Sequence, residues 1–194
     1  MSYTLDIFKF QLYCEKLNFD THSLSNLCVE LQNKNKDYGR VSSNIGGWQS
    51  DDLFDAYTVI SDLRKLIYNH IDIYSKNFKL NKKLKLDNLW ININGYKDSN
   101  LPHIHPNNIL SGVFYVKVPK NSGKIRFENP CLDLMESVYQ DSIIEYNLIN
   151  SATWCLEPDE NLLILFPSFL KHSVLPNMNK KEKRISISFN AGII

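Results

Sequence analysis

The sequence is poor in three features that would each identify a class of protein. Its four cysteines are widely spaced and never form a CxxC pair. Neither a disulfide scaffold nor a zinc knuckle is therefore expected. We expect the cysteines to be reduced thiols in a cytosolic protein. No apolar run approaches the roughly 20 residues of a membrane-spanning helix. The first residues, Met1–Ile7, lack a basic head and a continuous apolar segment, so they are not expected to be a signal peptide.

An excess of charge of either sign is also missing. Lysine and arginine number 22 against 21 for aspartate and glutamate, so no large field favours nucleic acid or a membrane as a partner. The basic cluster Asn179–Arg184 is most simply a solvated turn. The length of 194 residues and the hydrophobic fraction of 43% suit one domain, residues 1–194, with a full core. The oligomeric state stays open, a homodimer included.

The hydrophobic period changes near Lys85. Before it, helices are expected over Ser23–Lys34 and Asp51–Leu80, the second with apolar residues at helical spacing and Ser50 or Asp51 as its cap. The Gly-, Ser- and Asn-rich segment Ser42–Ser50 is expected to be a loop. Two histidines of this N-terminal part are expected to be surface or half-buried residues: His22, in the N-terminal loop, and His70, on the second helix.

After Lys85 the pattern is typical of strands. Strands are expected at Leu86–Asn94, Ser111–Pro119, Gly123–Glu128, Asn161–Pro167 and Arg184–Phe189, with a mixed strand and turn region at Val138–Leu148. Short strands separated by Pro, Gly and Asn turns predict a β-sandwich or jelly roll. The fold class is therefore mainly β with flanking helices: a helical part (about 1–85) buttresses a β core (about 86–194).

Three of the five histidines lie next to strand-like runs. His103 and His105 form an HxH pair between Pro102 and Pro106, and His172 follows the apolar strand Leu162–Phe166. The prolines bias their segment to extended geometry, which lowers the entropy lost when a metal binds. Imidazole is a common ligand of redox metals, and two close ligands with a distant third suit a facial site with open positions. We predict that these histidines are the metal ligands of a catalytic site.

The identity of the third ligand has two assignments. The usual iron oxygenase site has two histidines and one carboxylate. Here no Asp or Glu stands two residues after His103, and Asn107 stands two residues after His105. The favoured assignment puts His105 in the place of the carboxylate, which gives three histidines. The alternative has His105 and His172 alone, with Asn107 or water completing the shell.

Arg184 starts an alternating strand that predicts a carboxylate site. Arg184, Ser186 and Ser188 share one strand face, with Ile185, Ile187 and Phe189 on the other. The planar fork of arginine can bind both oxygens of a carboxylate, and Ser186 would donate a further hydrogen bond. A salt bridge across the sheet is the alternative role for Arg184. A metal next to a carboxylate clamp on a β framework is the outline of an iron and 2-oxoglutarate oxygenase.

Four more residues are candidates for the cosubstrate site. Tyr115 or Ser111 could donate to the same carboxylate, and a core or cross-strand role is the alternative at either position. Asn92 and Asn94 project in the same direction from their strand and could reach the metal-proximal end of the ligand, with a turn role as the alternative.

Four segments of the sequence resemble a group of 2-oxoglutarate-Fe(II) oxygenases found in marine bacteria and their phages. They are Ser43–Ser50, His103–Val116, Leu165–Val174 and Arg184–Asn190. The resemblance covers most of the chain from about Leu24 onward. It implies a double-stranded β-helix core, Fe(II) and 2-oxoglutarate, with the three histidines at the metal and Arg184 at the cosubstrate. In the wider superfamily His-x-Asp-Pro commonly opens the metal site, and His103–Pro106 matches it with His at the acidic position.

The expected activity is oxidation by O₂, most simply hydroxylation, of an unidentified small-molecule or peptidyl substrate, with release of succinate and CO₂. The expected location is cytoplasmic, in the host if the protein is phage-encoded. Trp48 is expected either at the substrate rim or in the core. Two rival functions stay open: a cupin-like metal enzyme that does not use 2-oxoglutarate, and a non-catalytic jelly-roll binding module. A nucleobase substrate is disfavoured because no basic aromatic groove is apparent.

Overall fold

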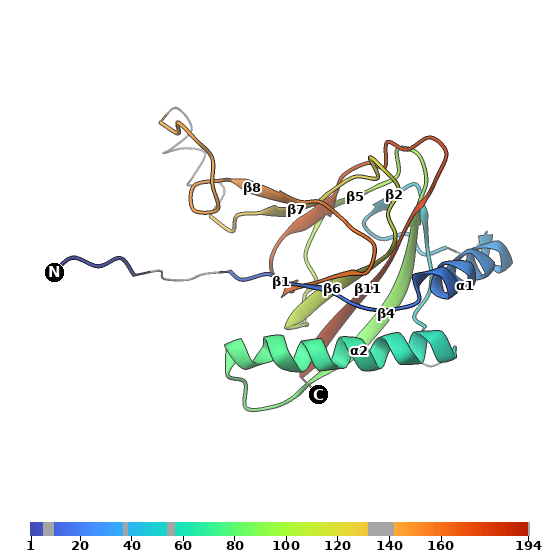
Figure 1. The fold of residues 1–194 in the computed structure, drawn as a ribbon, viewed down its shortest axis with the longest axis horizontal. Coiled ribbons are helices and arrows are strands. Elements are labelled where there is room, and N and C mark those ends of the chain that lie inside the picture. Colours follow the sequence, from blue (N-terminus) through green and yellow to red (C-terminus); the bar gives the residue numbers. More distant parts are fainter. Residues whose placement is uncertain (6–9, 37–38, 54–56, 132–141, 194) are drawn as a thin grey trace.

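The computed structural model describes residues 1–5, 10–36, 39–53, 57–131 and 142–193. Its strands pair antiparallel in two sheets, and helices cover one face of the larger sheet (Figure 1). The larger sheet has the order β1-β9-β6-β11-β4-β3, and the smaller has the order β2-β5-β10-β7-β8. The strands are β1 (Tyr13–Lys16), β2 (Asn44–Ile45), β3 (Trp48–Gln49), β4 (Leu84–Asn94), β5 (Ser99–His103), β6 (Leu110–Lys117), β7 (Ile125–Glu128), β8 (Thr153–Leu156), β9 (Leu162–Pro167), β10 (His172–Val174) and β11 (Arg184–Ile193).

Helix α1 (Thr21–Lys34) agrees with the prediction and begins two residues before it. Asp20 caps it, because its side chain accepts a hydrogen bond of 3.1 Å from the backbone N–H of Ser23. His22 lies exposed on this helix rather than in a loop. His70, half-buried as expected, accepts or donates a 2.8 Å hydrogen bond with the hydroxyl of Tyr13.

The predicted second helix was wrong at its start. Helix α2 spans Thr58–Ser75, followed by a 3₁₀ turn at Lys76–Phe78. Ser50 and Leu53 donate backbone hydrogen bonds of 3.0 Å to carbonyls of β4, and the Asp52 carboxylate accepts one of 2.9 Å from the Leu89 N–H. This segment is therefore extended along β4, which satisfies its backbone groups without a helix. Ser50 and Asp51 do not cap α2, whose N-cap residue is Tyr57.

The apolar stripe of α2 packs on the larger sheet, as the buttress prediction required. Ile60, Leu63, Ile67 and Ile71 recur at helical spacing and are fully buried. They belong to one core cluster with the residues of β4 and β11 that face the helices, namely Leu89, Ile91, Ile93, Ile185, Ile187 and Phe189. Alternation along each strand turns the intervening residues, which are mostly polar, toward the smaller sheet.

Strands β4 to β11 form the sandwich. Four of them belong to the larger sheet and four to the smaller one, and a second apolar cluster lies between the sheets: Val113, Tyr115, Ile125, Phe127, Ile164, Phe166 and Leu170. The protein is thus mainly β with flanking helices and has the double-stranded β-helix architecture that was expected. The five strands predicted with definite bounds correspond to β4, β6, β7, β9 and β11.

Several predicted segments need correction. Ser42–Ser50 is not only a loop, because it carries the two-residue strands β2 and β3. Strands β1, β5, β8 and β10 were not predicted. Of the predicted mixed region Val138–Leu148, residues 138–141 lie outside the described residues, and 142–148 form turns and bends without a strand. The four cysteines are free, as expected. Within the described ranges, no helix has the length and apolar character needed to cross a bilayer.

Candidate active site

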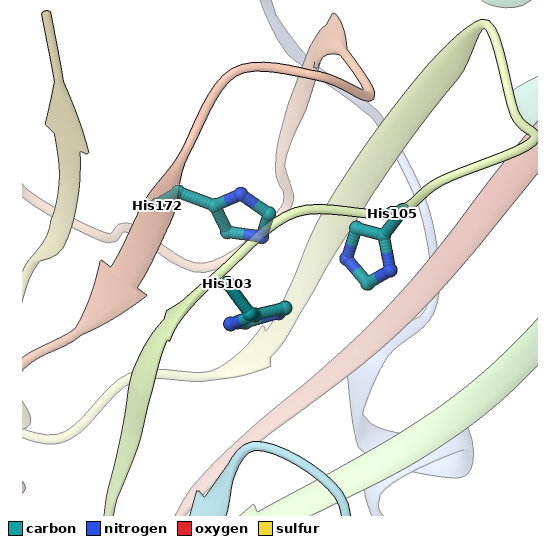
Figure 2. A group of neighbouring side chains, drawn as sticks. All are labelled: His103, His105 and His172. Atoms are coloured by element: carbon teal, nitrogen blue, oxygen red, sulfur yellow. The ribbon is translucent and has the colours of Figure 1, made fainter. Parts of the chain in front are cut away.

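The three predicted metal ligands come together between two neighbouring strands. His103 ends β5 and pairs with His172, the first residue of β10. His105 follows two residues after β5, where its backbone N–H donates a 3.0 Å hydrogen bond to the Ser168 carbonyl. The rings converge from these two segments (Figure 2), and their candidate ligand atoms all lie within 4.8 Å of one another.

Backbone carbonyls fix the tautomers of two of these histidines. Nδ1 of His103 lies 2.7 Å from the Leu101 carbonyl oxygen, and Nδ1 of His172 lies 2.9 Å from that of Leu170. A carbonyl oxygen only accepts, so each Nδ1 carries the hydrogen and donates it. Each Nε2 then keeps a free lone pair, which is the arrangement of a metal-binding histidine. The His105 ring packs against Trp90 instead, with 5.8 Å between ring centroids.

The histidines are held in their neutral form. Burial lowers the pKa of His103. Burial, and then the charge that His103 would carry, lower the pKa of His105 to about 4. Burial, and to a smaller extent the charges that His103 and His105 would carry, lower the pKa of His172 to about 3. At neutral pH all three therefore offer unprotonated nitrogen, the form that binds metal.

The larger sheet lines the rest of the pocket with rows of residues that face one another across strands. The first row pairs Ser188 with Trp90. The second row crosses four strands, from Tyr115 through Ser186 and Asn92 to Gln49. The third row pairs Arg184 with Asn94. All of these residues line one pocket with the three histidines. Because Trp90 contacts His105, the histidines lie toward the first row and Arg184 lies at the opposite end.

Arg184 is a buried cation that donates to backbone carbonyls. It is 1% exposed, and its Nη1 donates to the backbone carbonyls of Ser122, of Gly123 at 3.4 Å and of Leu175 at 3.5 Å. Within the described part of the chain, no carboxylate forms an ion pair with it. Burial lowers its pKa, while Tyr115 and then Asp98 raise it. A buried charge is costly unless it is paired, so this end of the pocket suits an anionic ligand.

The other predicted residues are placed as follows. Asn92 donates a 2.9 Å hydrogen bond to the Ser188 hydroxyl. Asn94 lies opposite Arg184 in the register of β4 and β11. This position favours a place for Asn94 at the carboxylate end of the pocket, whereas the metal-proximal end was expected for it. Ser111 instead bonds Ser168 and Asn190, at 2.9 and 2.7 Å. The alternative metal ligand, Asn107, lies on an exposed turn with φ of 70° and does not line the pocket.

The structure also adds residues that sequence reasoning missed. Trp90, Gln49 and Asn100 line the pocket. Trp90 could have been found from the alternation of β4, whereas Gln49 and Asn100 lie on strands that were not predicted. Trp48 has the core role rather than the rim role: it is 8% exposed, belongs to the helix-side cluster and donates from Nε1 to the Asn35 carbonyl.

The donor set fits iron and 2-oxoglutarate. Three neutral imidazoles within 4.8 Å of one another suit a facial iron site and leave other positions open. At the other end, the buried Arg184 cation suits one carboxylate of a dicarboxylate. A ligand with a metal-binding group at one end and a carboxylate at the other matches both requirements.

Comparisons with known proteins agree with this chemistry. A family model described as "Putative 2OG-Fe(II) oxygenase" matches residues 88–190, a segment that contains the three histidines and Arg184. No curated protein matches the chain. Solved structures are similar in fold at low identity. A prolyl-4-hydroxylase of Pseudomonas putida has a TM-score of 0.68 at 13% identity, over 95% of this chain and 92% of that one.

Two further structures are similar along nearly the whole chain. A Trichoplax adhaerens prolyl hydroxylase, in complex with a hypoxia inducible factor oxygen degradation domain peptide fragment, has a TM-score of 0.66 at 14% identity, over 95% of this chain and 83% of that one. HygX from Streptomyces hygroscopicus, with nickel and 2-oxoglutarate bound, has a TM-score of 0.63 at 10% identity, over 94% and 82%. These likenesses support the double-stranded β-helix fold. Since the family model matches more than half of the sequence, including every proposed metal ligand, the chain belongs to the 2OG-Fe(II) oxygenase family.

Proposed function

We propose that His103, His105 and His172 hold Fe(II), and that Arg184 holds 2-oxoglutarate, in an oxygenase that oxidises a second substrate. One observation carries the proposal. A single pocket joins three mutually close, neutral histidines at one end to a buried arginine without a carboxylate partner among the described residues at the other. A cupin-like enzyme that does not use 2-oxoglutarate would leave that arginine without a task.

The residues between the two ends have distinct roles. The Arg184 fork binds the far carboxylate through two hydrogen bonds. The hydroxyls of Ser186 and Tyr115, on paired positions of β11 and β6, donate to the same group. Asn94 completes that end, and Asn92 lies along the ligand in the next row. When bound, iron and 2-oxoglutarate supply O₂-dependent oxidation of the substrate, with release of succinate and CO₂.

Aromatic rings keep water away from the histidines. Phe166 and Phe127 stand 4.6 and 6.1 Å from the His172 ring, between centroids, and Trp90 covers His105. Excluding water strengthens electrostatic contacts and prevents side reactions. The substrate is a small molecule or a peptidyl group. A cytoplasmic location, as the free thiols suggest, is part of the proposal.

The test is succinate formation. Purified protein is loaded with Fe(II), then given 2-oxoglutarate and air, and succinate is measured with and without candidate substrates. We expect slow release without substrate, and none from the His172→Ala variant. Iron binding without any succinate across the panel would favour the cupin-like rival, and absence of stoichiometric iron would favour a binding module.

A further inference from the structure

Gln49 is a buried amide in the pocket that the proposed chemistry does not use. We propose that its side-chain oxygen accepts a hydrogen bond from an amide N–H of the substrate, and thereby selects a neutral, amide-bearing substrate. This inference rests on the proposed function, because it concerns the second substrate of the same pocket.

The backbone holds Gln49 in a defined position. It lies on the edge strand β3, where its neighbour Trp48 enters the helix-side core, so that Gln49 faces the other side of the sheet. It pairs with Asn92, is 5% exposed and lines the pocket. A tight turn precedes it: Gly46 and Gly47 have φ of 64° and 67°, a region that glycine adopts at no steric cost.

This turn connects the two sheets at one edge of the pocket. Strand β2 pairs with β5 of the smaller sheet, and β3 pairs with β4 of the larger sheet. Asn100 of β5 also lines the pocket and donates a 3.2 Å hydrogen bond to the Ser43 hydroxyl. Gln49 therefore lies in a wall that joins both sheets, at the β3 end of the row whose member Asn92 is proposed to lie along 2-oxoglutarate.

The oxygen of Gln49 lacks a hydrogen-bond donor. Oε1 is buried and has no partner among the residues that the structure describes, and a buried polar atom left without a partner is costly. The dianion of 2-oxoglutarate carries only acceptors, since its oxygens belong to two carboxylates and a ketone. It cannot supply the missing donor, which leaves water in the pocket, or a second ligand that displaces this water, to donate to Gln49.

The composition of the wall indicates that this donor is uncharged. Among the described residues that line the pocket, none is acidic, and apart from the three histidines and Trp90 the uncharged polar side chains are amides and hydroxyls. An ammonium group would find no acidic side chain to pair with among these residues, in a pocket that already holds the cation Arg184. An amide offers both an N–H donor and a carbonyl acceptor, which matches the carboxamides of Gln49, Asn92 and Asn100.

The experiment compares amides with their esters, since an ester keeps the shape and loses the N–H. Two sets of probes are titrated anaerobically into protein loaded with Fe(II) and 2-oxoglutarate: small N-acetyl amino acid N-methylamides, and blocked pentapeptides, each with its matching ester. Binding is followed by tryptophan fluorescence, because Trp90 lines the pocket. The set that binds distinguishes a free small amide from a peptide bond.

In the wild type, we expect the best amide to bind about three- to tenfold more tightly than its ester, the effect of one neutral hydrogen bond. Gln49→Met, similar in size without the acceptor, should remove this preference and leave the 2-oxoglutarate affinity unchanged. Gln49→Glu keeps an acceptor and should keep the preference; it serves if Gln49→Met does not fold. Gln32→Met makes the same change on α1, outside the pocket, and should alter neither affinity.

Four results would overturn the inference. The first is equal affinity of the wild type for every amide and its ester. The second and third are a preference for the amide that survives in Gln49→Met, or one that disappears in Gln49→Glu. The fourth is a tenfold loss of 2-oxoglutarate affinity in Gln49→Met, which would assign Gln49 to the cosubstrate. Failure of the proposed function is seen separately, because the wild type would then fail to bind Fe(II) or 2-oxoglutarate before any probe is added.

Discussion

The three histidines and Arg184 line one pocket in different charge states. Burial lowers the pKa of each histidine and so keeps it neutral near pH 7. Arginine stays charged even when burial lowers its pKa, because its ordinary value is so high. Neutral donors at one end and a fixed cation at the other are what a metal ion and a dicarboxylate require.

The three-histidine assignment can be tested against its alternative. His105→Ala should lower Fe(II) affinity by more than the roughly 10–100-fold that loss of a residue supporting a ligand costs, because a donor itself is lost. Asn107→Ala should leave it unchanged, since Asn107 is exposed and outside the pocket. Anaerobic iron titration of both variants decides the matter, and the reverse order of effects would show that Asn107 is the ligand.

Replacing Arg184 should weaken 2-oxoglutarate and spare iron. A charge-assisted, two-pronged contact contributes on the order of 1.5–3 kcal/mol, so Arg184→Met should reduce 2-oxoglutarate affinity about ten- to hundredfold. Arg184→Lys should recover only part of it, because an ammonium lacks the planar fork. Calorimetric titration measures both.

The matched control for Arg184→Lys is Arg126→Lys, on β7 and outside the lining of the pocket. Arg126→Lys should change neither the Fe(II) affinity nor the 2-oxoglutarate affinity. Normal 2-oxoglutarate affinity in a folded, iron-loaded Arg184→Met protein would contradict the assignment.

At the scale of elements, predictability followed periodicity. Long strands such as β4 and β11 were found because alternation over many residues is a strong signal, and it also placed Arg184, Ser186 and Ser188 on one face. Strands β2 and β3, of two residues each, are too short to show a period, and their partners lie far along the chain. The start of α2 was missed because residues 50–53 are held by hydrogen bonds to β4, a tertiary effect that overrides local pattern.

Close packing between strands makes a prediction about Gly112 on β6. A Cβ at Gly112 would lie 2.3 Å from the Phe189 ring and 2.8 Å from Leu165, both on paired strands. Gly112→Ala should therefore lower the free energy of unfolding by about 1–3 kcal/mol, the usual cost of overpacking. Urea denaturation measures it.

Gly192→Ala is the control, because its Cβ would approach nothing closer than the Asn108 side-chain oxygen at 3.3 Å. Its effect should stay within about 0.5 kcal/mol. Equal effects of the two variants would mean that the Phe189 ring does not lie over Gly112.

At the scale of the whole molecule, the metal site and the main core are separate. The largest apolar cluster lies between the helices and the larger sheet, whereas the histidines lie between the two sheets. The sequence predicted this layering from the change of period near Lys85. It could not predict Gln49 in the pocket wall, since that placement depends on the pairing of β3 with β4.

Metal removal should therefore destabilise the protein without unfolding it. A metal at a hundred times its dissociation constant stabilises the folded state by about 2.7 kcal/mol, and 1 kcal/mol shifts the melting temperature of a chain of this size by about 2–4 °C. A chelator should thus lower the melting temperature by roughly 5–10 °C in the wild type and hardly at all in His172→Ala. Thermal melts followed by circular dichroism test this, and a chelated protein already unfolded at 25 °C would contradict it.

The central claim is that one pocket binds iron at one end and 2-oxoglutarate across its length. Anaerobic titration of 2-oxoglutarate into iron-loaded and metal-free wild-type protein tests it most directly, because linkage requires each ligand to strengthen the other if they share the site. We predict one 2-oxoglutarate per chain, bound at least about tenfold more tightly with iron, a coupling of about 1.4 kcal/mol. Equal affinity with and without iron would contradict the account.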